Sequence, residues 1–199
     1  YKAGRHFLQV PGSTNIPDRV LRAIDAPAMD HRGPKFQDLS KRILERIKLI
    51  FKSTDPVVIF PSAGTGAMEA ALANTLNEGD KILMFETGHF ATEWCQAARR
   101  YKLDVDFVPG DWRTGADPKI VEKKLSEDKN HEIKAVLITH NETSTGIKSQ
   151  VEEIRKAIDS TNHPALFMVD TISSLGSYNY DHQKWKVDVT VGGSQKGLM

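Results

Sequence analysis

The chain has 199 residues, 39% of them hydrophobic and 27% charged, which is the balance of an ordinary soluble globular protein. Lysine and arginine number 27 against 26 aspartate and glutamate, so the net charge is +1 and clustered basic charge is not indicated. No apolar run is long enough to cross a bilayer, and Cys95, the only cysteine, excludes an intramolecular disulfide. We therefore expect small-molecule partners and other protein chains, no nucleic acid, no membrane and no metal. The expected compartment is the cytosol, with the peroxisome as the alternative for a eukaryotic chain.

Helical and strand-like segments alternate from residue 36 onward. Asp117 followed by Pro118 predicts a helix start, because an acid caps free N–H groups and proline suits the first helical position. Ser149 and Glu152 have the spacing of a capping box. The predicted helices are 36–52, 67–76, 89–101, 118–125 and 150–158, and the predicted strands are 57–60, 81–85, 105–108, 134–139, 165–169 and 187–191.

This alternation predicts an α/β fold with a mostly parallel sheet and helices on both faces. Ligands of such sheets bind beyond the carboxyl ends of the strands. That rule selects the loops 62–66, 86–90, 140–146, 170–174 and 192–199 as the candidate site.

Three of these loops carry residues suited to one cofactor. The small residues 62–66 between a strand and a helix expose backbone N–H groups that favour a phosphate, although a plain tight turn has the same composition. Asp170 directly follows a strand, where a turn or helix cap is the alternative role, and Lys196 follows another, where a solvated loop lysine is the alternative. A phosphate cradle, an acid and a lysine on one sheet meet the needs of pyridoxal phosphate, because the lysine forms a Schiff base with the aldehyde and the acid pairs with the pyridinium nitrogen.

Four motifs in order also resemble the signature of class V pyridoxal-phosphate-dependent aminotransferases, most like the serine–glyoxylate and alanine–glyoxylate (serine–pyruvate) enzymes. They are Ser62-Ala63-Gly64-Thr65-Gly66, His140-Asn141-Glu142-Thr143-Ser144-Thr145-Gly146, Val169-Asp170-Thr171-Ile172-Ser173-Ser174 and Gly193-Ser194-Gln195-Lys196-Gly197. The resemblance spans essentially the whole chain. It implies the large domain of a fold-type I transferase, with residues 1–35 as an N-terminal extension at the substrate mouth or dimer contact and 36–199 as the cofactor-binding domain. The sequence starts at Tyr1 and stops just after the lysine motif, so we expect a fragment in which the smaller C-terminal domain is absent.

The resemblance also implies a role for each site residue. Lys196 matches the Schiff-base lysine, whose freed amine moves the proton, and Asp170 matches the acid on the ring nitrogen. The cofactor-binding set it implies is Ala63, Gly64 and Thr65 at the phosphate, Phe90 and Ile172 on the two ring faces, Thr143 at the ring oxygen, and Gln195 beside the lysine. Core packing is the alternative for both Phe90 and Ile172.

The activity implied is ping-pong transamination from serine or alanine to glyoxylate, giving glycine and a 2-oxo acid, by a homodimer. Another class V donor such as 2-aminoethylphosphonate is an alternative. A desulfurase would need a nucleophilic cysteine on a later loop, and Cys95 falls in a predicted helix. A further alternative is an inactive truncated fragment, because the arginine expected for the substrate carboxylate would lie beyond Met199.

Overall fold

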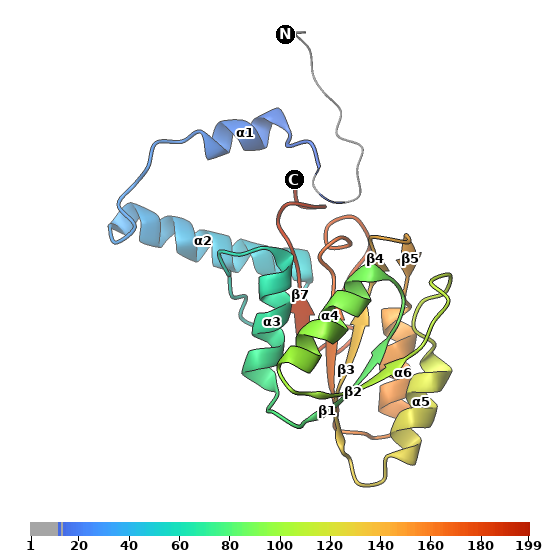
Figure 1. Ribbon diagram of the computed structural model, residues 1–199. Helices are drawn as coiled ribbons and strands as arrows, with labels where there is room; N and C mark the ends of the chain where they lie inside the picture. Colours follow the sequence, from blue (N-terminus) through green and yellow to red (C-terminus); the bar gives the residue numbers. More distant parts are fainter. Residues whose placement is uncertain (1–11, 13) are drawn as a thin grey trace.

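A computed structural model describes residue 12 and residues 14–199. A five-stranded sheet forms its centre, and a two-stranded hairpin lies beside the carboxyl edge (Figure 1). The helices are α1 Asp18–Ile24, α2 Pro34–Phe51, α3 Gly64–Thr75, α4 His89–Arg100, α5 Pro118–Glu127 and α6 Val151–Ser160. The strands are β1 Lys81–Phe85, β2 Asp104–Val108, β3 Ile133–Thr139, β4 Asn141–Glu142, β5 Ile147–Lys148, β6 Leu166–Asp170 and β7 Val189–Val191.

The central sheet has the strand order β2-β1-β3-β6-β7, and every neighbouring pair is parallel. The chain moves from β1 outward to β2 and then crosses back to β3 on the other side of β1. The order therefore reverses between β1 and β3, and the loops after these two strands separate at the carboxyl edge. Ligands of open parallel sheets bind at such a reversal point.

Alternate strand residues feed two hydrophobic cores on opposite faces of the sheet. On one face Leu83, Val136 and Phe167 pack with residues of α5 and α6. On the other face Met84, Leu137 and Met168 pack with residues of α3 and α4. Figure 1 shows the two helix pairs on either side of the sheet. The predicted α/β class, with a parallel sheet covered on both faces, is therefore confirmed. Both faces are covered because successive side chains of a strand point to opposite faces and both sets are apolar.

The predicted helix start at Asp117 is confirmed, because its carboxylate accepts a hydrogen bond from the Lys119 N–H at 2.9 Å. The predicted capping box of Ser149 and Glu152 is wrong. The N-cap of α6 is Gln150, and the Ser149 hydroxyl instead accepts a hydrogen bond from Ala116 N–H at 3.2 Å. The Ser149 hydroxyl thus binds a backbone N–H that is distant in sequence, and not an N–H group of the helix that the local pattern predicted.

The predicted strand at 57–60 is also wrong. These residues lie outside every strand of the described chain, and Val58 is 70% exposed. Pro56 and Pro61 flank the segment, and proline removes an N–H group that a sheet ladder needs. An apolar run without a neighbouring edge to pair with does not make a strand.

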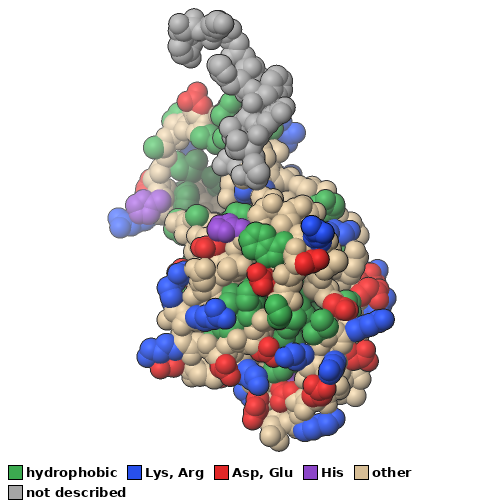
Figure 2. Space-filling model, turned by 45° about the vertical axis from the view of Figure 1, so that its right-hand side comes forward, with side chains coloured by type: hydrophobic (Ala, Val, Ile, Leu, Met, Phe, Trp, Pro, Cys, Tyr) green, Lys and Arg blue, Asp and Glu red, His purple; other side chains and the backbone are tan. Residues whose placement is uncertain are grey.

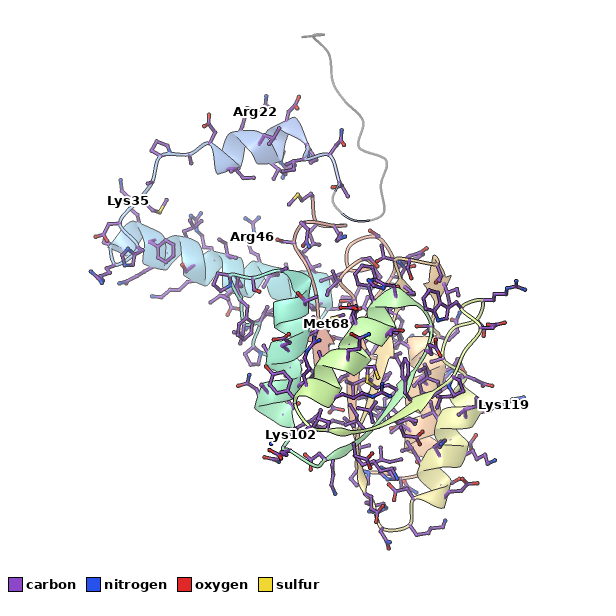
Figure 3. The ribbon with its side chains drawn as sticks, viewed as in Figure 1. Arg22, Lys35, Arg46, Met68, Lys102 and Lys119 are labelled. Atoms are coloured by element: carbon purple, nitrogen blue, oxygen red, sulfur yellow. The ribbon has the colours of Figure 1, made fainter. Side chains whose placement is uncertain are left out.

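Helices α1 and α2 form an arm that extends from the body (Figure 1). Arg22, Lys35 and Arg46 mark this arm in Figure 3, whereas Met68 on α3 lies against the sheet. No residue of α1 is buried, and α2 buries only Phe51, at its inner end. That end is fixed to the body, since His182 N–H donates to the Phe51 carbonyl at 3.0 Å. Neither α1 nor the β4–β5 hairpin was predicted from the sequence.

Charged side chains of both signs are interspersed on the lower part of the face shown in Figure 2. Within the described residues, no helix combines the length and apolarity that a membrane crossing requires.

Candidate active site

Asp170 is the last residue of β6 and lies at the carboxyl edge of the sheet, 4% exposed. Its Oδ1 accepts a hydrogen bond from Ile172 N–H at 2.8 Å, and its carbonyl accepts one from His140 N–H at 2.9 Å. Burial raises the pKa of the Asp170 carboxyl to about 7; the Ile172 hydrogen bond and the Lys196 charge oppose that rise, and the Glu142 charge adds to it. The site thus holds a desolvated acid whose charged form needs a cation.

Lys196 lies in the turn that follows β7, and its side chain is partly buried. Its Nζ is 3.8 Å from the position that a Cβ would take at Gly12. Gly12 has a φ of +137°, a backbone conformation that favours glycine. An open hollow of about 430 Å³ surrounds this lysine, and its lining is Gly12, Thr14, Asn15, Thr143, Ser173, Ser177, Lys196, Gly197 and Met199. The tertiary structure therefore joins both ends of the described chain at one hollow.

The small-residue turn forms the start of α3, which begins at Gly64, three residues earlier than predicted. Ala63 is its N-cap, and its side chain cannot accept a hydrogen bond from the first turn of the helix. Among the described residues, the N–H groups of Gly64 and Thr65 have no hydrogen-bond acceptor. Free donors at a helix N-terminus are the groups that bind an anion such as phosphate.

Ile172 connects this turn to the lysine loop. A Cβ built at Gly64 would lie 2.5 Å from Ile172 Cδ1, and one built at Gly193 would lie 3.2 Å from Ile172 Cγ2. Glycine at both positions lets the two backbones approach one apolar side chain. Gln195 folds back over the same loop, since its Oε1 would be 2.8 Å from a Cβ at Gly193.

The structure brings the predicted residues to one edge, but not all of them to one hollow. Thr143 and Lys196 line the hollow together. Five predicted residues do not line it: Ala63, Gly64 and Thr65 at the N-terminus of α3, Phe90 in the first turn of α4, and Gln195 in the lysine loop. Ile172, whose N–H donates to Asp170, contacts both the start of α3 and the lysine loop.

Sequence reasoning assigned no contacts to the polar groups that connect the site loops. Asn141 Nδ2 donates to Ser173 Oγ, which in turn donates to the Asn141 carbonyl, both at 2.9 Å. His140 Nδ1 is 3.0 Å from Ser174 Oγ, and the ring is buried near Tyr180. Burial first, and then the Lys148 charge, lower the pKa of His140 to about 4, so the ring is neutral near pH 7. The available signal was the position of His140 at the end of a buried strand.

Glu142 was missed as well, and it is fully buried in the loop after β3. Its carboxylate accepts hydrogen bonds from the Phe90 and Ala91 N–H groups of α4, at 3.2 and 3.0 Å. A charged residue three positions after the end of a buried strand was the signal in the sequence. Among the described residues, no group of three or more His, Cys, Asp or Glu side chains could hold a metal ion.

The residues of this edge fit pyridoxal phosphate on three observations. The buried Asp170 needs a cationic partner such as a protonated ring nitrogen, and that partner would lower its pKa again. The free N–H groups of Gly64 and Thr65 suit a phosphate, and Lys196 lies at the adjoining hollow. The fold is that of the large domain of a fold-type I pyridoxal-phosphate transferase.

The chain belongs to the class-V aminotransferase family, which matches residues 6–199. It is 49% identical to a serine–glyoxylate aminotransferase of Methylorubrum extorquens over 199 residues, which is 100% of this chain and 50% of that protein. It is 46% identical to an L-aspartate–glyoxylate aminotransferase of Paracoccus denitrificans, over 96% of this chain and 48% of that protein.

Among solved structures, the chain is similar to a ureidoglycine–glyoxylate aminotransferase of Bacillus subtilis, with a TM-score of 0.85 and 27% identity. That match covers 93% of this chain and 47% of the other. The chain therefore spans about half the length of the relatives it matches.

Proposed function

We propose that the polypeptide carrying this chain is a pyridoxal-phosphate-dependent aminotransferase that passes an amino group from an amino acid to glyoxylate. The products are glycine and a 2-oxo acid. The observation that carries the proposal is the buried Asp170 at the carboxyl edge of β6, within electrostatic reach of Lys196. Family membership supports the same cofactor.

Each predicted site residue would have its own role in holding the cofactor. Asp170 would accept the hydrogen bond of the protonated ring nitrogen, and the Gly64 and Thr65 N–H groups, with Ala63 before them, would hold the phosphate. Phe90 and Ile172 would cover the two faces of the ring. Thr143 would reach the ring oxygen, and Gln195 would contact the cofactor beside the lysine. When bound, pyridoxal phosphate supplies an electron-accepting ring and a carbon that carries the amino group between substrates.

Lys196 performs the proton transfer in this proposal. Its Nζ, when not bonded to the cofactor, would take the proton from the substrate Cα and would then donate it to the cofactor. Lys196 is partly buried, and the hollow that it lines leaves space for a substrate beside its amine. Asp170 would keep a proton on the ring nitrogen, because its buried carboxylate would be the counterion there.

Glyoxylate is the better supported substrate. The relatives named above share glyoxylate in their names, whereas their donors are serine, L-aspartate and ureidoglycine. Serine is the proposed donor because three relatives that are 44% to 49% identical to this chain carry that name. A desulfurase-type use of Cys95 is disfavoured, since this thiol is 1% exposed inside α4.

We also propose a homodimer whose subunits meet through the arm of α1 and α2, with residues 1–35 as an extension toward the partner. The exposed apolar side chains of the arm, Leu49 among them, support this proposal. The cytosol remains the proposed compartment.

A visible absorption spectrum of the full-length polypeptide with pyridoxal phosphate tests the function. We expect an absorption band of the protein-bound cofactor at a wavelength above roughly 400 nm. This band should bleach when serine is added and return when glyoxylate is added. A band that is indifferent to serine would retain the cofactor but reject this donor. Lys196→Ala should abolish turnover, and full activity of that variant would refute the proposal.

A further inference from the structure

Helix α4 starts without a capping side chain of its own. Its N-cap is Gly88, which offers no side-chain acceptor. The first three N–H groups of a helix need partners from outside the helix. In this protein all three partners come from the loop after β3, which is more than fifty residues away in sequence.

Glu142 and Ser144 divide these donors between them. His89 N–H donates to Ser144 Oγ at 3.0 Å, Phe90 N–H to Glu142 Oε1 at 3.2 Å, and Ala91 N–H to Glu142 Oε2 at 3.0 Å. Ser144 Oγ also donates to Glu142 Oε1 at 2.8 Å. The two side chains therefore form one hydrogen-bonded cap over the first turn of α4.

The cap occupies the space that a side chain at position 88 would need. A Cβ built at Gly88 would lie 2.4 Å from Glu142 Cγ and 2.7 Å from Ser144 Oγ. Glycine at position 88 thus leaves the space that the Glu142 side chain occupies. A fully buried carboxylate in this position is stabilised by charge-assisted hydrogen bonds and by the positive end of the helix dipole.

This cap joins the two loops that flank the reversal point of the sheet. Phe90 is the second residue of α4, and Thr143 lies directly between Glu142 and Ser144. We propose that Glu142 is a positioning residue of the cofactor site, whose carboxylate fixes Phe90 on α4 relative to Thr143. The inference rests on the proposed function, since it takes Phe90 and Thr143 as cofactor contacts.

Glu142→Gln is the direct test. The amide keeps the shape of the side chain but points an N–H group at one of the helix N–H groups, so one hydrogen bond is replaced by a repulsive contact. In the full-length, cofactor-free protein we expect amide hydrogen exchange at residues 89–91 to rise about tenfold or more, as for one lost charge-assisted hydrogen bond. The dissociation constant for pyridoxal phosphate should rise by about tenfold for the same reason.

Two further variants keep the test decisive if Glu142→Gln folds poorly. Ser144→Ala removes the acceptor for His89 N–H and the hydroxyl that donates to Glu142, but it leaves the Glu142 carboxylate in place for Phe90 and Ala91. Exchange should therefore rise mainly at residue 89, and affinity should fall less than in Glu142→Gln. Glu152→Gln is the matched control, because Glu152 is an acid in the first turn of α6 whose side chain is 42% exposed. This control should change neither exchange at 89–91 nor cofactor affinity.

A readout of ring geometry separates positioning from a merely structural role. With cofactor at saturation, Glu142→Gln should alter the visible circular dichroism per bound cofactor, whereas Glu152→Gln should leave it at the wild-type value. Unchanged exchange at 89–91, or faster exchange with wild-type affinity and dichroism, would overturn this inference alone. A wild-type protein that bound no pyridoxal phosphate would overturn the proposed function and this inference with it.

Discussion

At the scale of single residues, Asp170 is an ionisable carboxyl group whose burial disfavours its charged form. Its carboxyl is 4% exposed, and the pKa is raised from its ordinary value of 3.8 to about 7. A folded-state pKa above the unfolded one means that the folded protein binds the proton more tightly. The associated stability is fully present below about pH 4 and is lost as the pH rises toward about 7. A change of about three pKa units corresponds to about 4 kcal/mol.

Asp170→Asn should therefore stabilise the cofactor-free protein in a pH-dependent way. The amide keeps an oxygen acceptor for Ile172 N–H but carries no charge to desolvate. We expect a gain of about 2–4 kcal/mol at pH 8 and little gain near pH 4, together with loss of turnover in the holoenzyme. Urea unfolding at both pH values measures the gain.

Asp104→Asn is the control for this prediction, because Asp104 is exposed at the start of β2. It should change stability little at either pH. An equal gain from Asp170→Asn at pH 4 and pH 8 would show that desolvation of the charge is not the cause.

At the scale of elements, the amino edge of the sheet depends on Asp128. Its carboxylate accepts hydrogen bonds from Ile133 N–H at 2.7 Å and Glu132 N–H at 3.1 Å, at the start of β3. It also lies 3.1 Å from Nε2 of the buried His163, which precedes β6. Burial acts to raise the pKa of Asp128, but these hydrogen bonds outweigh it and lower the pKa overall. One side chain thus connects the starts of two neighbouring strands.

Asp128→Ala should cost about 2–4 kcal/mol of unfolding free energy, because it leaves two backbone donors and a buried histidine without their acceptor. The midpoint of urea unfolding at pH 7 measures the loss. The neighbouring Glu127→Ala is the control: this side chain is 63% exposed, and its nearest ion-pair contact, with Lys123, is at 4.0 Å. Similar losses in the two variants would contradict the proposed tie between the strands.

The lowered pKa of Asp128 adds a second expectation at the same element. The stability that it contributes is present above the ordinary carboxyl value of 3.8 and is lost as the pH falls through the lower folded value. The difference between wild type and Asp128→Ala should therefore shrink in strong acid.

At the scale of the whole molecule, the arm is notable for its exposed apolar side chains. Leu49 on α2 is 76% exposed, and Val58, Ile59 and Phe60 after it are also open to solvent. Contiguous exposed apolar surface is typical of a protein–protein contact. A dimer through the arm would bury these side chains without altering the two cores of the body.

Leu49→Glu should therefore shift the full-length protein from dimer to monomer while the body stays folded. Sedimentation velocity measures the assembly state, and far-ultraviolet circular dichroism checks the fold. Tyr101→Glu, at an exposed apolar residue after α4, should leave the dimer unchanged. A Leu49→Glu protein with wild-type sedimentation would exclude the arm as the contact.

The sequence by itself determined the parallel α/β class, because apolar strands and amphipathic helices alternate and strand side chains feed both faces. It also selected the carboxyl-edge loops, together with Asp170 and Lys196, since residues that follow parallel strands share one edge. The motif order was sufficient to identify the family, which the match over residues 6–199 confirms.

Only the tertiary structure decided the contacts between distant segments. The cap of α4 by Glu142 and Ser144, the packing of Ile172 on Gly64, and the closeness of Gly12 to Lys196 are such contacts. The same holds for the two wrong predictions. The Ser149 hydroxyl accepts a hydrogen bond from Ala116 N–H, and residues 57–60 do not pair with any strand of the described chain. Local patterns state which hydrogen bonds and apolar contacts a segment can make, but the choice among them depends on which neighbour the folded chain brings within reach.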